Sequence, residues 1–182
     1  MDTLYDKVKK WLAANSKPRH MAHFERTAYW VGQLKPGADE AMFIAALAHD
    51  AERVFRDKAT KHAGAYIREP EYLHAHQEGG AKMAGEFLGR SGADEALIER
   101  VKMLISKHEE GGTQDQNVIM DADSISFFEN NVDHFANDLM KIYGKDKTVE
   151  KFKWMYSRMS SARAQEIAKD WYDRALRLVG EK

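Results

Sequence analysis

The chain has 182 residues, 43% of them hydrophobic, and few glycines and prolines, a composition that favours one compact domain and excludes a disordered chain. Its 28 Lys and Arg balance 29 Asp and Glu, so no overall field draws it to a nucleic-acid polymer or an anionic membrane. Cysteine is absent, which excludes disulfides, thiolate zinc sites and cysteine nucleophiles. No stretch has the length of a membrane span or the pattern of a signal peptide, and we therefore expect a cytoplasmic protein.

The first part of the chain predicts three helices. Residues 3–15 place apolar side chains at helical spacing, and residues 18–34 begin at a proline and end before a second one. The third helix is expected from Ala38 to Phe55, with Asp39 as its cap. The polar stretch from Arg56 to Tyr72 has no clear apolar face, so we expect a loop or short helix that covers a site.

The remainder of the chain continues the helical pattern. Helices are expected over Leu73–Leu88 and Asp94–Glu109, from Asp121 to beyond Phe128, and over Val149–Met159 and Ser161–Val179, with a polar connection at Thr113–Asn117 and a break at Gly144–Lys147. No segment alternates with a period of two, and there is no internal repeat. The sequence therefore predicts a single all-α domain over residues 1–182, with roughly seven to nine helices.

Several polar side chains occupy positions on the apolar faces of these helices. They are His23, His49, Asp50, His76, His108 and one aspartate of the pair Asp121 and Asp123. Burying a charged or strongly polar group is unfavourable unless a partner or a metal compensates for the lost hydration. Imidazole and carboxylate without thiolate form a ligand set for Mn, Fe, Co, Ni or Zn, whereas Mg or Ca prefers more oxygen. We therefore expect a buried site for a divalent transition metal.

The order of these residues resembles that of a known family. An isolated histidine (His23), a His-Asp doublet after a small apolar run (His49-Asp50) and a late aspartate in Asp121-Ala122-Asp123-Ser124-Ile125 resemble the HD superfamily of metal-dependent phosphohydrolases. The likeness covers residues 20–128. His76 and His108 are similar to the two extra histidines of members that bind two metals. The resemblance implies a helical bundle built around a metal site.

The resemblance also implies a role for each of these residues. His23, His49, Asp50 and a late aspartate would hold the first of one or two metals, and Asp50 would bridge to a second held by His76 and His108. Asp123 is favoured as the late ligand because residues 122–125 are similar to the family's Ala-Asp-Arg-Leu stretch, although Ser124 replaces its arginine. Asp121 would then cap a helix or accept a hydrogen bond beside the site.

The residues directly after the doublet depart from the family pattern. Ala51-Glu52-Arg53 stands where Ile-Gly-Lys is common. The guanidinium of Arg53 suits a phosphate one turn beyond the metals, and Glu52 could accept a proton from water on the metal. The alternative for both residues is a solvated surface pair.

These features predict an enzyme. We expect hydrolysis of a phosphoester or phosphoanhydride bond in a nucleotide or another small phosphorylated metabolite, with Asp50, Glu52 and Arg53 as the catalytic residues. Two other functions stay open: a dinuclear-iron oxygenase with the same ligands, and a non-catalytic sensor that binds a nucleotide or metabolite. Membrane and nucleic-acid partners are not expected, and no pattern fixes an oligomeric state.

Overall fold

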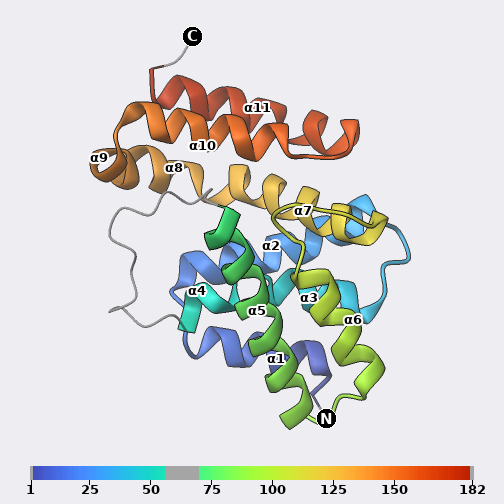
Figure 1. The fold of residues 1–182 in the computed structure, drawn as a ribbon. Helices are drawn as coiled ribbons and strands as arrows, with labels where there is room; N and C mark the ends of the chain where they lie inside the picture. Colours follow the sequence, from blue (N-terminus) through green and yellow to red (C-terminus); the bar gives the residue numbers. More distant parts are fainter. Residues whose placement is uncertain (1, 56–69, 181–182) are drawn as a thin grey trace.

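The computed structural model describes residues 2–55 and 70–180, and no strand occurs among them. The prediction of an all-α fold is confirmed (Figure 1). The elements are α1 (Leu4–Ala13), α2 (Pro18–Leu34), α3 (Glu40–Ala48), α4 (Ala51–Phe55), α5 (Pro70–Arg90), α6 (Glu95–Ile105), α7 (Gln114–Asn130), α8 (Val132–His134), a π-helical segment (Phe135–Leu139), α9 (Met140–Tyr143), α10 (Lys145–Ser157) and α11 (Ala162–Leu178). Within these residues, no helix combines the length and hydropathy that a membrane span requires.

Helix α3 is the centre of the first hydrophobic cluster. Its residues from Ile44 to Ala48 have no solvent exposure, as expected of a helix that is apolar on every side. Helices α1, α2, α6 and α7 pack against it, and the small alanine side chains of α3 let them approach closely. The helix that ends directly before the His-Asp doublet is therefore fixed by packing on all sides.

Helix α7 connects this cluster to a second one. Ile119 and Ala122 belong to the cluster around α3, whereas Ile125 and Phe128, one to two turns later, pack with α10 and α11. Figure 1 shows α10 and α11 side by side across one end of the molecule, beyond α7. Because one helix serves both clusters, the described chain forms one domain, and residues near the middle of α7 lie where the clusters meet.

Several predicted boundaries are wrong. The helix expected from Ala38 to Phe55 is divided, since α3 ends at Ala48 and α4 begins at Ala51. The stretch Thr113–Asn117, expected as a connection, contains the N-cap and first turn of α7, where Thr113 and Gln116 form a capping box.

Other helices begin or end elsewhere than expected. Helix α10 begins at Lys145, inside the expected break, and α6 ends at Ile105, four residues early. Of the loop or short helix expected over residues 56–72, residues 56–69 lie outside the described part, and residues 70–72 begin α5.

Candidate metal centre

Six of the predicted side chains come together in two adjoining groups. His23, His49 and Asp123 form one group, and Asp50, His76 and His108 form the other; within each, the potential ligand atoms lie within 4.8 Å of one another. Asp50 contacts both, because its Oδ1 lies 3.0 Å from His76 Nε2 and its Oδ2 lies 3.9 Å from His49 Nε2. All six residues are buried. The chain therefore gathers nitrogen and oxygen ligands from five segments in its interior.

His49 and His108 occupy equivalent local positions. Each lies just after a helix, α3 or α6, and each has its Nδ1 2.8 Å from a carbonyl oxygen of the preceding turn, that of Ala46 or Ile105. A carbonyl only accepts hydrogen bonds, so Nδ1 carries the proton and Nε2 presents a lone pair. The end of each helix thus fixes the imidazole, because its last carbonyls have no partner within the helix.

His23 and His76 are oriented by side chains. The hydroxyl of Ser126, on α7, donates to the backbone oxygen of His23, so its Oγ accepts from His23 Nδ1 at 2.8 Å. His76 Nδ1 donates to Glu52 Oε2, also at 2.8 Å. In the neutral forms of His23, His49 and His108, Nε2 is left as the unprotonated nitrogen, whereas His76 lies between two carboxylates, because its Nε2 is also hydrogen-bonded to Asp50 Oδ1 at 3.0 Å. A carboxylate that orients a histidine in this way is a common partner of metal ligands.

The resulting arrangement is suited to a cation. The Nε2 atoms of His23 and His49 lie 3.1 and 3.3 Å from Asp123 Oδ1. When both imidazoles are neutral, their nitrogen lone pairs face the lone pairs of this carboxylate oxygen. The Nε2 atoms of His49 and His108 are buried and accept no hydrogen bond in the described part of the chain. Buried polar atoms without partners are rare and need an explanation. A divalent metal in each group would supply the missing positive charge, so the residues present fit one or two metals.

An ion-pair chain joins the second oxygens of the two aspartates. Arg53 contacts Asp50 Oδ2 at 2.9 Å and Glu109 Oε1 at 2.8 Å. Arg158 contacts the other oxygen of Glu109 and, at 2.5 Å, Asp123 Oδ2. Each aspartate therefore has one oxygen that faces histidines and a second that is paired with an arginine, and in Asp50 this second oxygen also lies 3.9 Å from His49 Nε2. This arrangement orients both carboxylates before any metal binds.

The electrostatic environment favours an ionised Asp123, a neutral His108 and a positive charge at His49. Burial opposes the charge of Asp123, but Arg158 and His49 outweigh it and lower its pKa well below the usual value. Burial lowers the pKa of His108 to about 3, so this imidazole is neutral at pH 7. Burial also acts to lower the pKa of His49, but the charges of Asp50 and Asp123 prevail and raise it to about 9. The carboxylates thus attract a positive charge, a proton or a metal ion, to His49.

The structure separates the two candidate aspartates of α7. Asp123 faces His23 and His49, whereas Asp121 accepts hydrogen bonds from the backbone N–H groups of Ser160 and Ser161 at 2.6 and 3.1 Å. Both serine hydroxyls also contact Asp121. Asp121 therefore holds the connection between α10 and α11 in place and lies outside both groups.

Glu52 and Arg53 lie at the centre, as expected, but both are already engaged. Glu52 orients His76, and Arg53 is paired with two carboxylates. The alternative of a solvated surface pair is therefore wrong, because these contacts are with buried partners. The roles in proton transfer and phosphate binding remain predictions.

Sequence reasoning missed four residues of the centre, namely Ser126, Glu109, Lys151 and Arg158. Lys151 carried a usable signal, because it follows Thr148 and precedes Met155 at helical spacing on an apolar stripe of α10, as the histidines do on theirs. Glu109 and Arg158 gave no comparable signal, since both lie just beyond the end of a helix, where charged residues are usually exposed.

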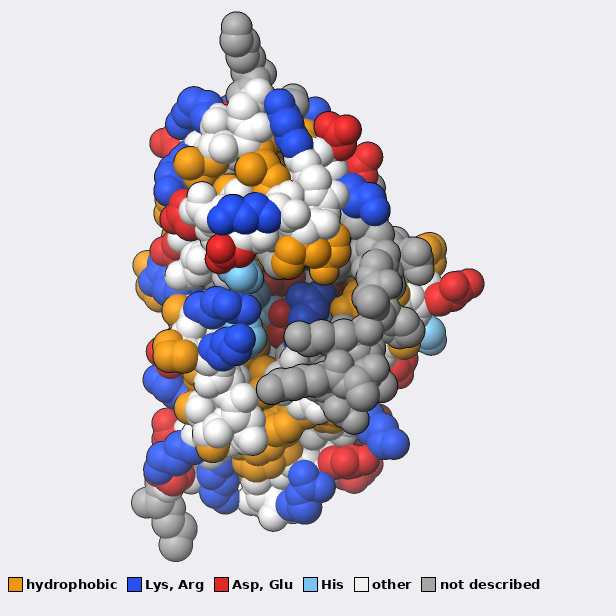
Figure 2. All heavy atoms as spheres, turned by 90° about the vertical axis from the view of Figure 1, so that its left-hand side faces the viewer, with side chains coloured by type: hydrophobic (Ala, Val, Ile, Leu, Met, Phe, Trp, Pro, Cys, Tyr) orange, Lys and Arg blue, Asp and Glu red, His pale blue; other side chains and the backbone are white. Residues whose placement is uncertain are grey.

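The centre is partly open to the surface. The side chain of Arg53 is 33% exposed and that of Glu52 17%. Figure 2 shows histidine, acidic and basic side chains together in a hollow near the middle of one face.

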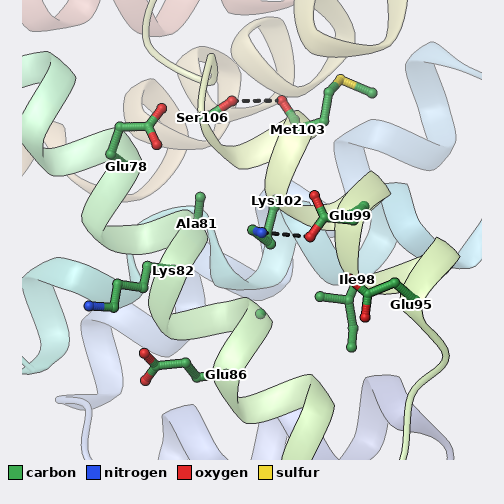
Figure 3. Close-up of a pocket in the computed structure, with 11 residues that line it drawn as sticks. Glu78, Ala81, Lys82, Glu86, Glu95, Ile98, Glu99, Lys102, Met103 and Ser106 are labelled. Carbon is green, nitrogen blue, oxygen red and sulfur yellow. Dashed lines mark hydrogen bonds and ion pairs between the residues drawn. The ribbon is translucent and has the colours of Figure 1, made fainter.

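A separate groove of about 740 Å³ lies between α5 and α6 (Figure 3). None of the six potential ligands lines it, and its charged side chains include the ion pair of Lys102 and Glu99, 2.6 Å apart. The groove is distinct from the candidate metal centre.

Comparison with curated proteins and with solved structures finds no match to this chain. A family model does match, over residues 5–179, which include both groups of potential ligands and the helices that position them. The chain belongs to the family described as a domain of unknown function, DUF4202.

Proposed function

We propose that this protein is a metal-dependent phosphohydrolase that acts on a small phosphorylated metabolite. The observation that carries the proposal is the convergence of four buried imidazole Nε2 atoms and two carboxylates, with the Nδ1 of each histidine held by another group of the chain. The six residues that supply these atoms are the ones whose order along the chain resembles the HD superfamily. A bound divalent metal would supply hydroxide at neutral pH by lowering the pKa of water, and would stabilise charge on phosphoryl oxygens.

The residues of the chain would perform distinct tasks in this reaction. Asp50 contacts both groups, so it would set the spacing between two metals. Arg53 lies beside Asp50 with a partly exposed guanidinium, which suits it to bind a phosphoryl oxygen. Glu52 would keep His76 in the tautomer that presents Nε2 and is the predicted proton acceptor. The buried walls of the centre would exclude bulk water and strengthen these interactions.

Cations beside the centre favour phosphate chemistry over oxygen activation, and the complete set of potential ligands favours catalysis over passive sensing. Two arginines and a lysine lie next to the potential ligands, as expected for a site that receives an anion. Activation of dioxygen needs no such cations. A sensor would not require the complete set of ligands.

The test is phosphate release from a panel of phosphomonoesters, phosphodiesters and nucleoside polyphosphates by metal-loaded protein. Asp50→Ala should retain less metal and lose turnover by at least about a hundredfold, because it removes the residue shared by both groups. Asp133→Ala, which changes an exposed aspartate, is the matched control and should behave as the unmodified protein. Folded Asp50→Ala protein with full metal content and full turnover would overturn the proposal. Oxygen consumption by an iron-loaded protein that releases no phosphate would favour the oxygenase instead.

A further inference from the structure

Lys151 is a buried lysine without an ionic partner among the described residues, and burial lowers the pKa of its ammonium to about 7. It is 6% exposed, and its ammonium lies over two aromatic rings, 4.3 Å from the ring centroid of Trp154 and 5.7 Å from that of Phe127. No hydrogen bond or ion pair joins Lys151 to any residue in the described ranges. Aromatic faces compensate for only a small part of the hydration that a buried ammonium loses. A lysine in this position is unfavourable for folding and calls for another explanation.

The position of Lys151 on α10 directs it to the candidate metal centre. Lys151, Trp154 and Arg158 follow one another at intervals of three and four residues, so they share one face of the helix. The guanidinium of Arg158 lies over the same Trp154 ring, at 4.6 Å, and reaches Glu109 and Asp123. The charges that act most strongly on Lys151 are those of Glu109, Arg158 and Arg53. The ammonium is thus adjacent to the ion-pair chain but takes no part in it.

Arg158, Arg53 and Lys151 differ in how many of their hydrogen-bond donors are left unused by the protein. Arg158 donates from Nε to Ser124 and from its two terminal nitrogens to Glu109 and Asp123, so it is a positioning residue with no nitrogen left for a ligand. Arg53 donates only from its terminal nitrogens to Asp50 and Glu109, and its side chain is partly exposed. The ammonium of Lys151 contacts aromatic rings and makes no hydrogen bond to a residue in the described part of the chain. Donors that can receive a ligand therefore remain on Lys151 and Arg53.

We infer that Lys151 and Arg53 form an anion subsite beside the metal centre, where they bind oxygens of a tetrahedral phosphoryl group. The site rests on the proposed function for its phosphate chemistry, but its location follows from the geometry of Lys151. A phosphate offers several acceptor oxygens and at least one negative charge, which together would satisfy the lysine. Glu109 does not do so in this structure, where each of its oxygens is paired with an arginine.

The experiment measures binding of inorganic phosphate to metal-loaded protein by calorimetry, without turnover. Lys151→Met removes the charge but keeps an unbranched apolar side chain on the Trp154 ring, and it should weaken phosphate binding at least tenfold with unchanged metal content. Lys151→Arg should restore most of the affinity. Lys153→Met, at an exposed position of the same helix, should bind phosphate as the unmodified protein does. A second readout is thermal unfolding without phosphate, in which Lys151→Met should unfold at a higher temperature because an unpaired buried charge is gone.

The outcomes separate this inference from the proposed function. Phosphate affinity that is equal in Lys151→Met and the unmodified protein would overturn the subsite, whether or not the protein is a hydrolase. Failure of the unmodified, metal-loaded protein to bind phosphate would also overturn it. Lys151-dependent phosphate binding in a protein that hydrolyses none of the substrates tested would support the subsite and count against the hydrolase. A lower unfolding temperature for Lys151→Met would show that the lysine is structural.

Discussion

Substitution of Glu52 tests how the second group of ligands is held. Glu52 Oε2 accepts the Nδ1–H of His76, a residue only 1% exposed. In Glu52→Ala this donor loses its acceptor, at a cost of about 1–3 kcal/mol. Loss of such an outer partner typically weakens metal binding by about 10–100-fold, which agrees with that range. We therefore expect Glu52→Ala to bind the metal of the Asp50, His76 and His108 group about 10–100-fold more weakly.

Glu52→Gln separates orientation of His76 from proton transfer. Its amide oxygen can still accept from His76, so metal binding should weaken by less than about tenfold, while the loss of a basic carboxylate should lower turnover. Competition with a chelator of known affinity measures each metal separately. The group of His23, His49 and Asp123 serves as an internal control, and Glu86→Ala, at an exposed position, as a matched one. Two metals bound by Glu52→Ala with unchanged affinity would refute the role of Glu52 in orienting His76.

Two further predictions concern stability. A Cβ on Gly80 would lie 3.0 Å from the backbone oxygen of His49, so Gly80→Ala should lose about 1 kcal/mol of unfolding free energy and retain less metal, whereas Gly89→Ala, which meets only ordinary contacts, should gain up to about 1 kcal/mol. Equal effects of the two would contradict the close approach of α5 to His49. Hydrogen bonds from Lys35 and Arg100 lower the pKa of Asp115, so this carboxylate stabilises the fold above its unfolded pKa of about 3.9, and the contribution is lost as pH falls through the folded value. Asp115→Asn should therefore lower unfolding free energy by about 1 kcal/mol at pH 7 and by progressively less below pH 4, as measured in urea; a loss independent of pH would contradict this.

The helical fold could be predicted because its signal is local. Apolar residues repeat at helical spacing along most of the chain, and breakers such as Lys35-Pro36-Gly37 follow real helix ends. Where such local signals are missing, the boundaries were wrong. Nothing at Ala48 resembles a helix stop, and His49 itself keeps helical dihedral angles of −53° and −37°, so the division between α3 and α4 could not be seen in the sequence.

The candidate ligands could be identified for a related reason. A histidine or aspartate on an apolar stripe contradicts the pattern of its own helix, and this contradiction is visible without a structure. The contacts that orient these side chains depend on how distant segments pack. Ser126 meets His23 across 103 positions, and Arg158 meets Glu109 across 49. Lys151 and Arg158 reach the centre because α10 and α11 pack against α7.

The most direct test of the metal centre is elemental analysis of protein purified without chelator and then reconstituted, beside His76→Ala and His108→Ala. Four oriented imidazoles and two carboxylates in two groups predict close to two divalent metals per chain, falling toward one in both variants. His134→Ala, which changes a histidine outside both groups, should keep the full content. Absence of bound metal in the unmodified protein after reconstitution would contradict the account, because the buried Nε2 atoms would then have to be satisfied in some other way.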